Sequence, residues 1–100
     1  MIKRIVKLTF RPEEIPAFLE IFENSKDKIR ASEGCQHLEL WRAKAPENVL
    51  FTYSYWESED HLNQYRHSEL FKATWAKTKI LFADKPEAWS VESCGLPVAG

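Results

Sequence analysis

Aromatic and hydroxyl side chains between residues 49 and 82 are the best candidates for chemistry in this chain. Trp56 ends an apolar run, and Thr52 and Ser54 precede it at alternate positions, so all three share one face if the run is a strand. Phe71 and Trp75 lie four residues apart and share one face of a helix. Aromatic walls with a few hydroxyl groups are typical of small-molecule sites. These five residues are the predicted substrate-binding pocket; the alternative is that both tryptophans only fill the core.

Candidates for proton transfer and metal binding are few. His37 lies in a predicted strand and could act as a general base, because imidazole exchanges protons near neutral pH. The alternative is an ordinary surface or interface histidine. His61 and His67 are six residues apart, which is not the i, i+4 spacing of a helical metal pair. The sequence therefore predicts no metal site and leaves Trp56 and His37 as the only catalytic candidates.

Composition limits the classes of protein to which the chain can belong. It has 100 residues, 44% of them hydrophobic, and a net charge of −1, which predicts one globular domain and no nucleic-acid partner. No apolar run reaches the roughly 20 residues of a membrane span, and the start of the chain does not look like a signal peptide. We expect a cytoplasmic protein that does not bind membranes, with Cys35 and Cys94 as free thiols.

Hydrophobic periodicity predicts four strands and two helical regions. The first helix has an apolar face that includes Phe18 and Phe22, and Gly34 is expected to end it. Ser58 can cap the second helical region, and a further start near Ser68 indicates a broken helix. The predicted strands are residues 2–10, 35–42, 49–56 and 88–94, and residues 95–100 are expected to form a tail outside the domain of residues 1–94.

This order, β-α-β-β-α-β, is that of the ferredoxin-like fold, an antiparallel sheet with helices on one face. In such a sheet the strands that hold Cys35 and Cys94 lie at opposite edges, too far apart for a disulfide. The second face of the sheet would expose Phe51, Tyr53 and Tyr55. We therefore expect a homodimer, in which a second subunit covers that face.

Three segments resemble the antibiotic biosynthesis monooxygenase (ABM) domain: Thr52-Tyr-Ser-Tyr-Trp56, the helix start Ser58-Glu59, and His67-Ser68-Glu69-Leu70-Phe71. The resemblance extends over roughly residues 2–94. It implies a dimeric α/β barrel with a pocket between sheet and helices in each subunit. It also implies oxygenation of polycyclic phenols without a cofactor, or haem breakdown, or neither activity.

The resemblance carries over residue by residue. Trp56 matches the family's tryptophan at the strand end. Thr52 stands where cofactor-free oxygenases have an asparagine, and Trp75 stands where haem-degrading relatives have their iron ligand. The leading interpretation is an oxidoreductase, a cofactor-independent monooxygenase of an aromatic, quinol-like compound. One alternative is a non-catalytic dimeric module that binds small molecules or serves in stress; the other is a haem-degrading oxygenase.

Overall fold

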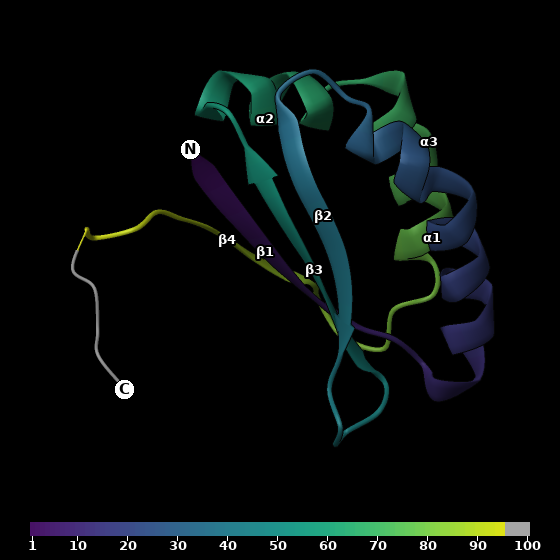
Figure 1. The fold of residues 1–100 in the computed structure, drawn as a ribbon. Helices are drawn as coiled ribbons and strands as arrows, with labels where there is room; N and C mark the ends of the chain where they lie inside the picture. Colours follow the sequence, from purple (N-terminus) through teal and green to yellow (C-terminus); the bar gives the residue numbers. More distant parts are fainter. Residues whose placement is uncertain (96–100) are drawn as a thin grey trace.

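The computed structural model describes residues 1–95 and contains a four-stranded sheet with helices on one side of it (Figure 1). Residues 96–100, most of the predicted tail, lie outside the described part of the chain. The elements in chain order are β1 (Ile2–Thr9), a short 3-10 helix η1 (Pro12–Glu14), α1 (Ile15–Arg30), β2 (Cys35–Arg42), β3 (Val49–Trp56), α2 (Glu59–Arg66), α3 (Glu69–Lys79) and β4 (Glu87–Val91).

The sheet is antiparallel, with the strand order β2-β3-β1-β4. The ferredoxin-like prediction is confirmed. The long central pair is β1 with β3, in which Arg4 lies opposite Ser54 and Val6 opposite Thr52. β2, which begins with Cys35, and β4, which ends three residues before Cys94, form opposite edges of the sheet, and both cysteines are free thiols.

Alternation within the strands gives the sheet two different faces. Leu8, Leu50 and Trp56 are buried on the face that packs against the helices. The other face carries Tyr53 and Tyr55, and Figure 1 shows no helix of the described chain on that side. Each strand therefore contributes every second side chain to the space under the helices.

The first helix, α1, ends earlier in the chain than its sequence indicated. It contains Pro16 in the first turn, where proline costs little, and it ends at Arg30 rather than near Gly34. Gly34 belongs instead to the turn that leads into β2, with φ +83°. A Cβ atom at this position would lie 2.3 Å from Cγ of His61, so the glycine serves the close approach of α2.

The predicted break in the second helical region is confirmed, and two serines produce it. The Ser58 hydroxyl accepts a hydrogen bond from the backbone N–H of His61 at 3.2 Å and caps α2. The Ser68 hydroxyl accepts from the N–H of Phe71 at 3.1 Å and caps α3. Each cap satisfies a donor that the first helical turn leaves open. The break allows α3 to take its own direction and to pack against α1.

The last strand was expected at residues 88–94 but occupies Glu87–Val91. Its partner β1 explains the difference, because β1 begins at Ile2 and its pairing with β4 ends where Val91 lies opposite Lys3. None of the helices in the described residues is long and apolar enough to cross a membrane.

Candidate functional site

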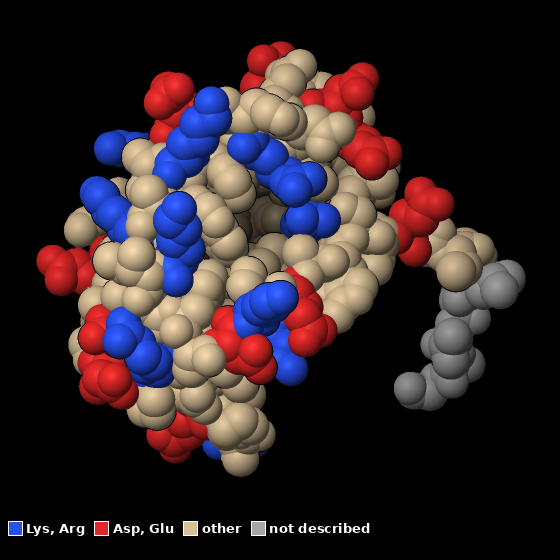
Figure 2. Space-filling model, turned by 180° about the vertical axis from the view of Figure 1, so that it is seen from behind, with Lys and Arg blue, Asp and Glu red and all other residues tan. Residues whose placement is uncertain are grey.

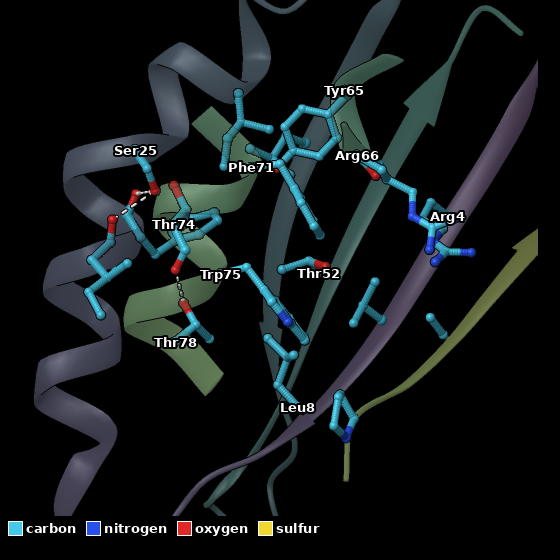
Figure 3. Close-up of a pocket in the computed structure, with 18 of the residues that line it drawn as sticks. Arg4, Leu8, Ser25, Thr52, Tyr65, Arg66, Phe71, Thr74, Trp75 and Thr78 are labelled. Atoms are coloured by element: carbon cyan, nitrogen blue, oxygen red, sulfur yellow. Dashed lines mark hydrogen bonds between the residues drawn. The ribbon is translucent and has the colours of Figure 1, made fainter. Parts of the chain in front are cut away.

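A cavity of about 360 Å³ lies between the inner face of the sheet and the helices. Figure 3 shows side chains from the strands and from α1 and α3 pointing into it. Its lining is mostly apolar and includes Leu8 and Phe18 from one buried cluster and Trp56 and Leu62 from another. A volume near the lower end of typical ligand pockets suits a molecule of two or three fused rings.

All five residues of the predicted pocket line this one cavity: Thr52, Ser54, Trp56, Phe71 and Trp75. The period of two in β3 brings the first three to the inner face. The four-residue spacing in α3 stacks the rings of Phe71 and Trp75, with centroids 5.8 Å apart and an interplanar angle of 9°. Their position is thus a feature of the structure, whereas their role in binding a substrate stays a prediction.

Trp56 is both a core residue and part of the cavity wall. Its side chain is only 1% exposed, and its ring stacks on Tyr65 with centroids 4.8 Å apart. Its indole Nε1–H donates to the Ser54 hydroxyl at 3.0 Å. The two readings of Trp56 from the sequence, core filling and pocket lining, therefore describe the same residue.

Hydroxyl groups in the cavity lining differ in whether they are already used in hydrogen bonds within the protein. Ser25 and Thr78 donate to backbone carbonyls of their own helices, at 2.7 and 2.8 Å. Ser54 accepts from Trp56, so its own O–H remains able to donate. Thr52 makes no side-chain hydrogen bond within residues 1–95, and Figure 3 shows it beside Trp75 in the middle of the cavity. Thr52 and Ser54 are therefore the hydroxyls that the sheet makes available to a ligand, and Thr74 of α3 and Tyr65 of α2 add hydroxyl groups from the helices.

Tyr65 of α2 also lines the cavity, although its sequence position did not single it out. It lies between Trp56 and Phe71, whose ring is edge-on to it at 5.3 Å. Burial, and to a lesser extent the neighbouring Cys35, raises the pKa of Tyr65 to about 12, so the side chain is a neutral phenol. The signal in the sequence was its spacing, three residues after the buried Leu62.

Two arginines, Arg4 and Arg66, complete the lining at one end, and sequence reasoning missed both. Arg4 shares the inward-facing positions of β1 with Val6 and Leu8. A charged residue among these apolar positions was the feature of the sequence that could have indicated its role. Figure 2 shows a hollow in the molecular surface with basic side chains at its rim and uncharged residues around it. This end of the cavity is therefore electropositive.

His37 is not brought together with the other predicted residues. It does not line the cavity, and its ring packs against Tyr53 and Tyr55 of the outer sheet face. Its Nε2 lies 2.7 Å from a carboxylate oxygen of Glu39. This pair lowers the pKa of Glu39, with a further contribution from Trp41. A general base at His37 would act on the outer face of the sheet.

Metal and haem ligands are not gathered at the cavity either. Within residues 1–95 no imidazole or carboxylate side chain lines it, and no group of three candidate metal ligands occurs. His61 and His67, which lack the spacing of a helical metal pair, are held by Ser58 and by the carbonyl of Asn63. What the cavity offers is aromatic surface, hydroxyl donors and positive charge.

Comparison with known proteins gives this cavity its family context. The family model described as antibiotic biosynthesis monooxygenase matches residues 1–77. The chain belongs to the antibiotic biosynthesis monooxygenase family. The matched part of this ABM protein runs from β1 into α3 and contains all five residues of the predicted pocket. The family resemblance expected from the sequence is thereby confirmed.

Solved structures show the same fold. An antibiotic biosynthesis monooxygenase superposes with a TM-score of 0.88 at 16% identity, over 97% of this chain and 100% of that chain. A conserved protein of Methanosarcina mazei Go1 gives 0.86 at 19% identity, over 90% and 89%. A Mycobacterium tuberculosis protein gives 0.84 at 19% identity, over 99% and 98%. Among curated proteins, none matches this sequence. At these identities the similarity establishes the fold.

Proposed function

We propose that this ABM protein is a cofactor-independent monooxygenase that oxidises an aromatic, quinol-like compound. The observation that carries the proposal is the cavity, in which the rings of Phe71 and Trp75 lie opposite a sheet face that offers the hydroxyls of Thr52 and Ser54. A planar ring fits between the aromatic side chains, and its phenolic oxygen accepts hydrogen bonds from the hydroxyls. Family membership supports the choice of reaction.

The reaction needs no external reductant, because the substrate supplies all the electrons. A phenol such as 1-naphthol reacts with O₂ at the ring carbon para to the hydroxyl. One oxygen atom becomes the new carbonyl of the quinone, and the other leaves as water with the phenolic and ring hydrogens. The chain contributes an apolar enclosure for the electron-rich ring and donors aimed at the phenolate oxygen as negative charge develops there.

A second function is favoured by one specific observation. The cavity lining within the described residues contains no carboxylate or imidazole that could take the phenolic proton. A non-catalytic module that binds the same class of aromatic compound needs no such base. Oxidation and simple binding therefore use the same cavity and are separated by whether O₂ is consumed.

We also propose that two copies of the chain associate through the outer face of the sheet. The Trp41 ring stacks on Tyr53 with centroids 4.4 Å apart, and Trp41 and Trp89 remain 41% and 45% exposed. Burying an aromatic surface of this kind removes apolar area from water. Since the cavity lies on the other face of the sheet, the second copy leaves it open.

The decisive experiment incubates the purified protein with 1-naphthol under ¹⁸O₂ and measures oxygen consumption and the mass of the naphthoquinone. We expect one ¹⁸O atom in each quinone molecule. Thr52→Val keeps the side-chain shape but removes the hydroxyl, and it should lower kcat/KM about ten-fold, the value of one hydrogen bond to a charged group.

The matched control is Thr9→Val, because Thr9 does not line the cavity. It should leave kcat/KM unchanged. If 1-naphthol binds in calorimetry but no oxygen is consumed, the oxygenase proposal is wrong and the binding module remains. A Thr9→Val effect equal to that of Thr52→Val would show that the hydroxyl acts through stability alone.

A further inference from the structure

Two arginine side chains share the electropositive end of the cavity. Figure 3 shows Arg4 on β1 and Arg66 at the end of α2 pointing toward one another. Within residues 1–95 neither guanidinium takes part in a salt bridge. Arg4 donates one hydrogen bond, to the Ser90 hydroxyl at 3.1 Å. Because a guanidinium has five N–H donors, most of the donors of this pair are not used by acceptors within residues 1–95.

Arg4 is partly buried and Arg66 is exposed, and the two like charges oppose one another. Burial, and then the charge of Arg66, lowers the pKa of Arg4, whereas no neighbouring carboxylate acts in the other direction. A basic side chain in the last turn of a helix is favourable by itself, which accounts for Arg66. It does not account for Arg4, which lies in a strand among inward-facing apolar side chains. An anion held between the two guanidinium groups accounts for both.

We propose that the cavity binds aromatic carboxylates, with the carboxylate held by Arg4 and Arg66 and the ring system between Phe71, Trp75 and Trp56. The planar fork of arginine matches the two oxygens of a carboxylate, which a lysine would not do. The apolar remainder of the lining excludes a ligand that is charged along its whole length. The ligand is therefore an amphipathic molecule, acidic at one end and aromatic at the other.

This inference rests on the proposed function, because it uses the same cavity, and it adds what orients the substrate there. Thr52 lies in the middle of the cavity, away from the arginine end (Figure 3). A carboxylate anchored at Arg4 and Arg66 would fix the direction of the ring and present a distal phenolic oxygen to Thr52, because Ser54 lies opposite Arg4 in the sheet and belongs to the arginine end. Restricting a bound ring to one orientation is a recognised contribution to rate.

The test measures binding by calorimetry with three probes of equal ring size: 2-naphthoate, 2-naphthalenemethanol and 2-naphthyl phosphate. None of them is a phenol, so binding is measured apart from oxidation. We expect 2-naphthoate to bind about 10- to 100-fold more tightly than the neutral alcohol, as charge-assisted hydrogen bonds imply. Arg4→Gln and Arg66→Gln should each remove most of that preference and leave the affinity for the alcohol unchanged.

Arg42→Gln is the matched control, since Arg42 does not line this cavity and bonds only to the carbonyl of Glu47 among the described residues. It should keep the full preference for 2-naphthoate. The variant Arg4→Lys tests whether the planar guanidinium matters, because lysine keeps the charge but cannot bind both carboxylate oxygens in the same way. It should show only part of the preference for 2-naphthoate over the alcohol. Thermal unfolding of each variant establishes that it is folded before binding is compared.

The possible outcomes separate this inference from the proposed function. Equal affinities for 2-naphthoate and the alcohol would overturn the carboxylate site and leave the cavity as an aromatic site. Tighter binding of 2-naphthyl phosphate than of 2-naphthoate would overturn the choice of carboxylate. No binding of any probe would overturn the carboxylate site, and the incubation with 1-naphthol would still decide the proposed function separately. If Arg42→Gln also lost the preference for 2-naphthoate, the preference would arise from the net charge of the protein, and the carboxylate site would be overturned.

Discussion

Trp56 combines two demands in one side chain, because the ring that closes the cavity also fills the core. Replacing it with alanine removes the stacking on Tyr65 and the hydrogen bond to Ser54 and leaves a void. We expect Trp56→Ala to lower the free energy of unfolding by about 3–5 kcal/mol. Urea denaturation followed by circular dichroism measures the change.

The control for this prediction is Trp56→Phe, which keeps an aromatic ring for Tyr65 and loses only the indole N–H and part of the volume. It should cost clearly less than the alanine variant. If Trp56→Ala cost less than about 1 kcal/mol, the cavity would have to extend over the whole ring, and the core role of Trp56 would be refuted.

Tyr65 makes stability depend on pH in the alkaline range. Its pKa is raised to about 12, whereas an unfolded chain loses the phenol proton near pH 10. Between these values the unfolded state binds fewer protons than the folded one, so stability is complete below about pH 10 and falls as pH rises toward 12. The loss attributable to Tyr65 should be about 2–3 kcal/mol.

Urea unfolding of the protein and of Tyr65→Phe at pH 9 and pH 11.5 measures this contribution. The difference between the two proteins should change with pH, because phenylalanine has no proton to lose. The hydrogen bond with Tyr53, and then burial, also raise the pKa of Tyr55. Tyr55 is present in both proteins, so its contribution cancels in the difference between them. Parallel pH curves would show that Tyr65 titrates normally.

At the scale of the elements, the turn between α1 and β2 depends on Gly34. Its φ of +83° suits glycine, and a Cβ there would collide with the His61 ring. Gly34→Ala should therefore destabilise the fold through two separate causes, strain of the backbone and displacement of α2. Backbone strain of this kind is worth about 1–2 kcal/mol, and the collision adds to it.

A double-mutant comparison separates the two causes. In a His61→Gly background both the ring and the Cβ atom that the new methyl group would meet are absent, so Gly34→Ala should cost only about 1–2 kcal/mol in urea denaturation. In the natural background the cost should be larger. Equal costs in both backgrounds would mean that α2 does not rest on this glycine.

Periodicity in the sequence was sufficient to predict the elements that build the cavity. The alternation in β3 and the four-residue spacing in α3 are local patterns, and they placed Thr52, Ser54, Trp56, Phe71 and Trp75 on the right faces. The end of β4 was not predictable in this way, because it is set by where β1 begins, more than eighty residues earlier in the chain.

The polar part of the site was harder to predict from the sequence than the apolar part. A charged residue in a strand usually indicates the solvent side, so the sequence does not predict that Arg4 lines a cavity, although its position shares a face with Val6 and Leu8. A basic residue at a helix end is favourable by itself, so Arg66 carries no signal of a binding site. Only the folding of α2 over the strand ends brings Arg66 toward Arg4.

For the whole molecule, the proposed dimer would form through the outer face of the sheet. Sedimentation at micromolar concentration should give twice the chain mass of 11.7 kDa. Tyr53→Glu places a charge among Trp41, Tyr55 and His37 and should yield monomers, because burying an unpaired charge is costly. Lys72→Glu, on the exposed side of α3, is the control and should remain dimeric. A monomeric natural protein would refute the proposed interface.

The alternation along the two central strands has a consequence for how this protein can be redesigned and how it can diverge. In β1 and β3 the even-numbered positions, such as Arg4, Val6, Thr52 and Ser54, line the cavity, and the odd-numbered ones belong to the outer face. If the proposed ligand site and the proposed dimer interface are right, both depend on the same sixteen residues, yet each can be changed without the other. A lineage that acquired a new ligand through even positions would keep its assembly, whereas a single-residue insertion in either strand would exchange the two sets and damage both.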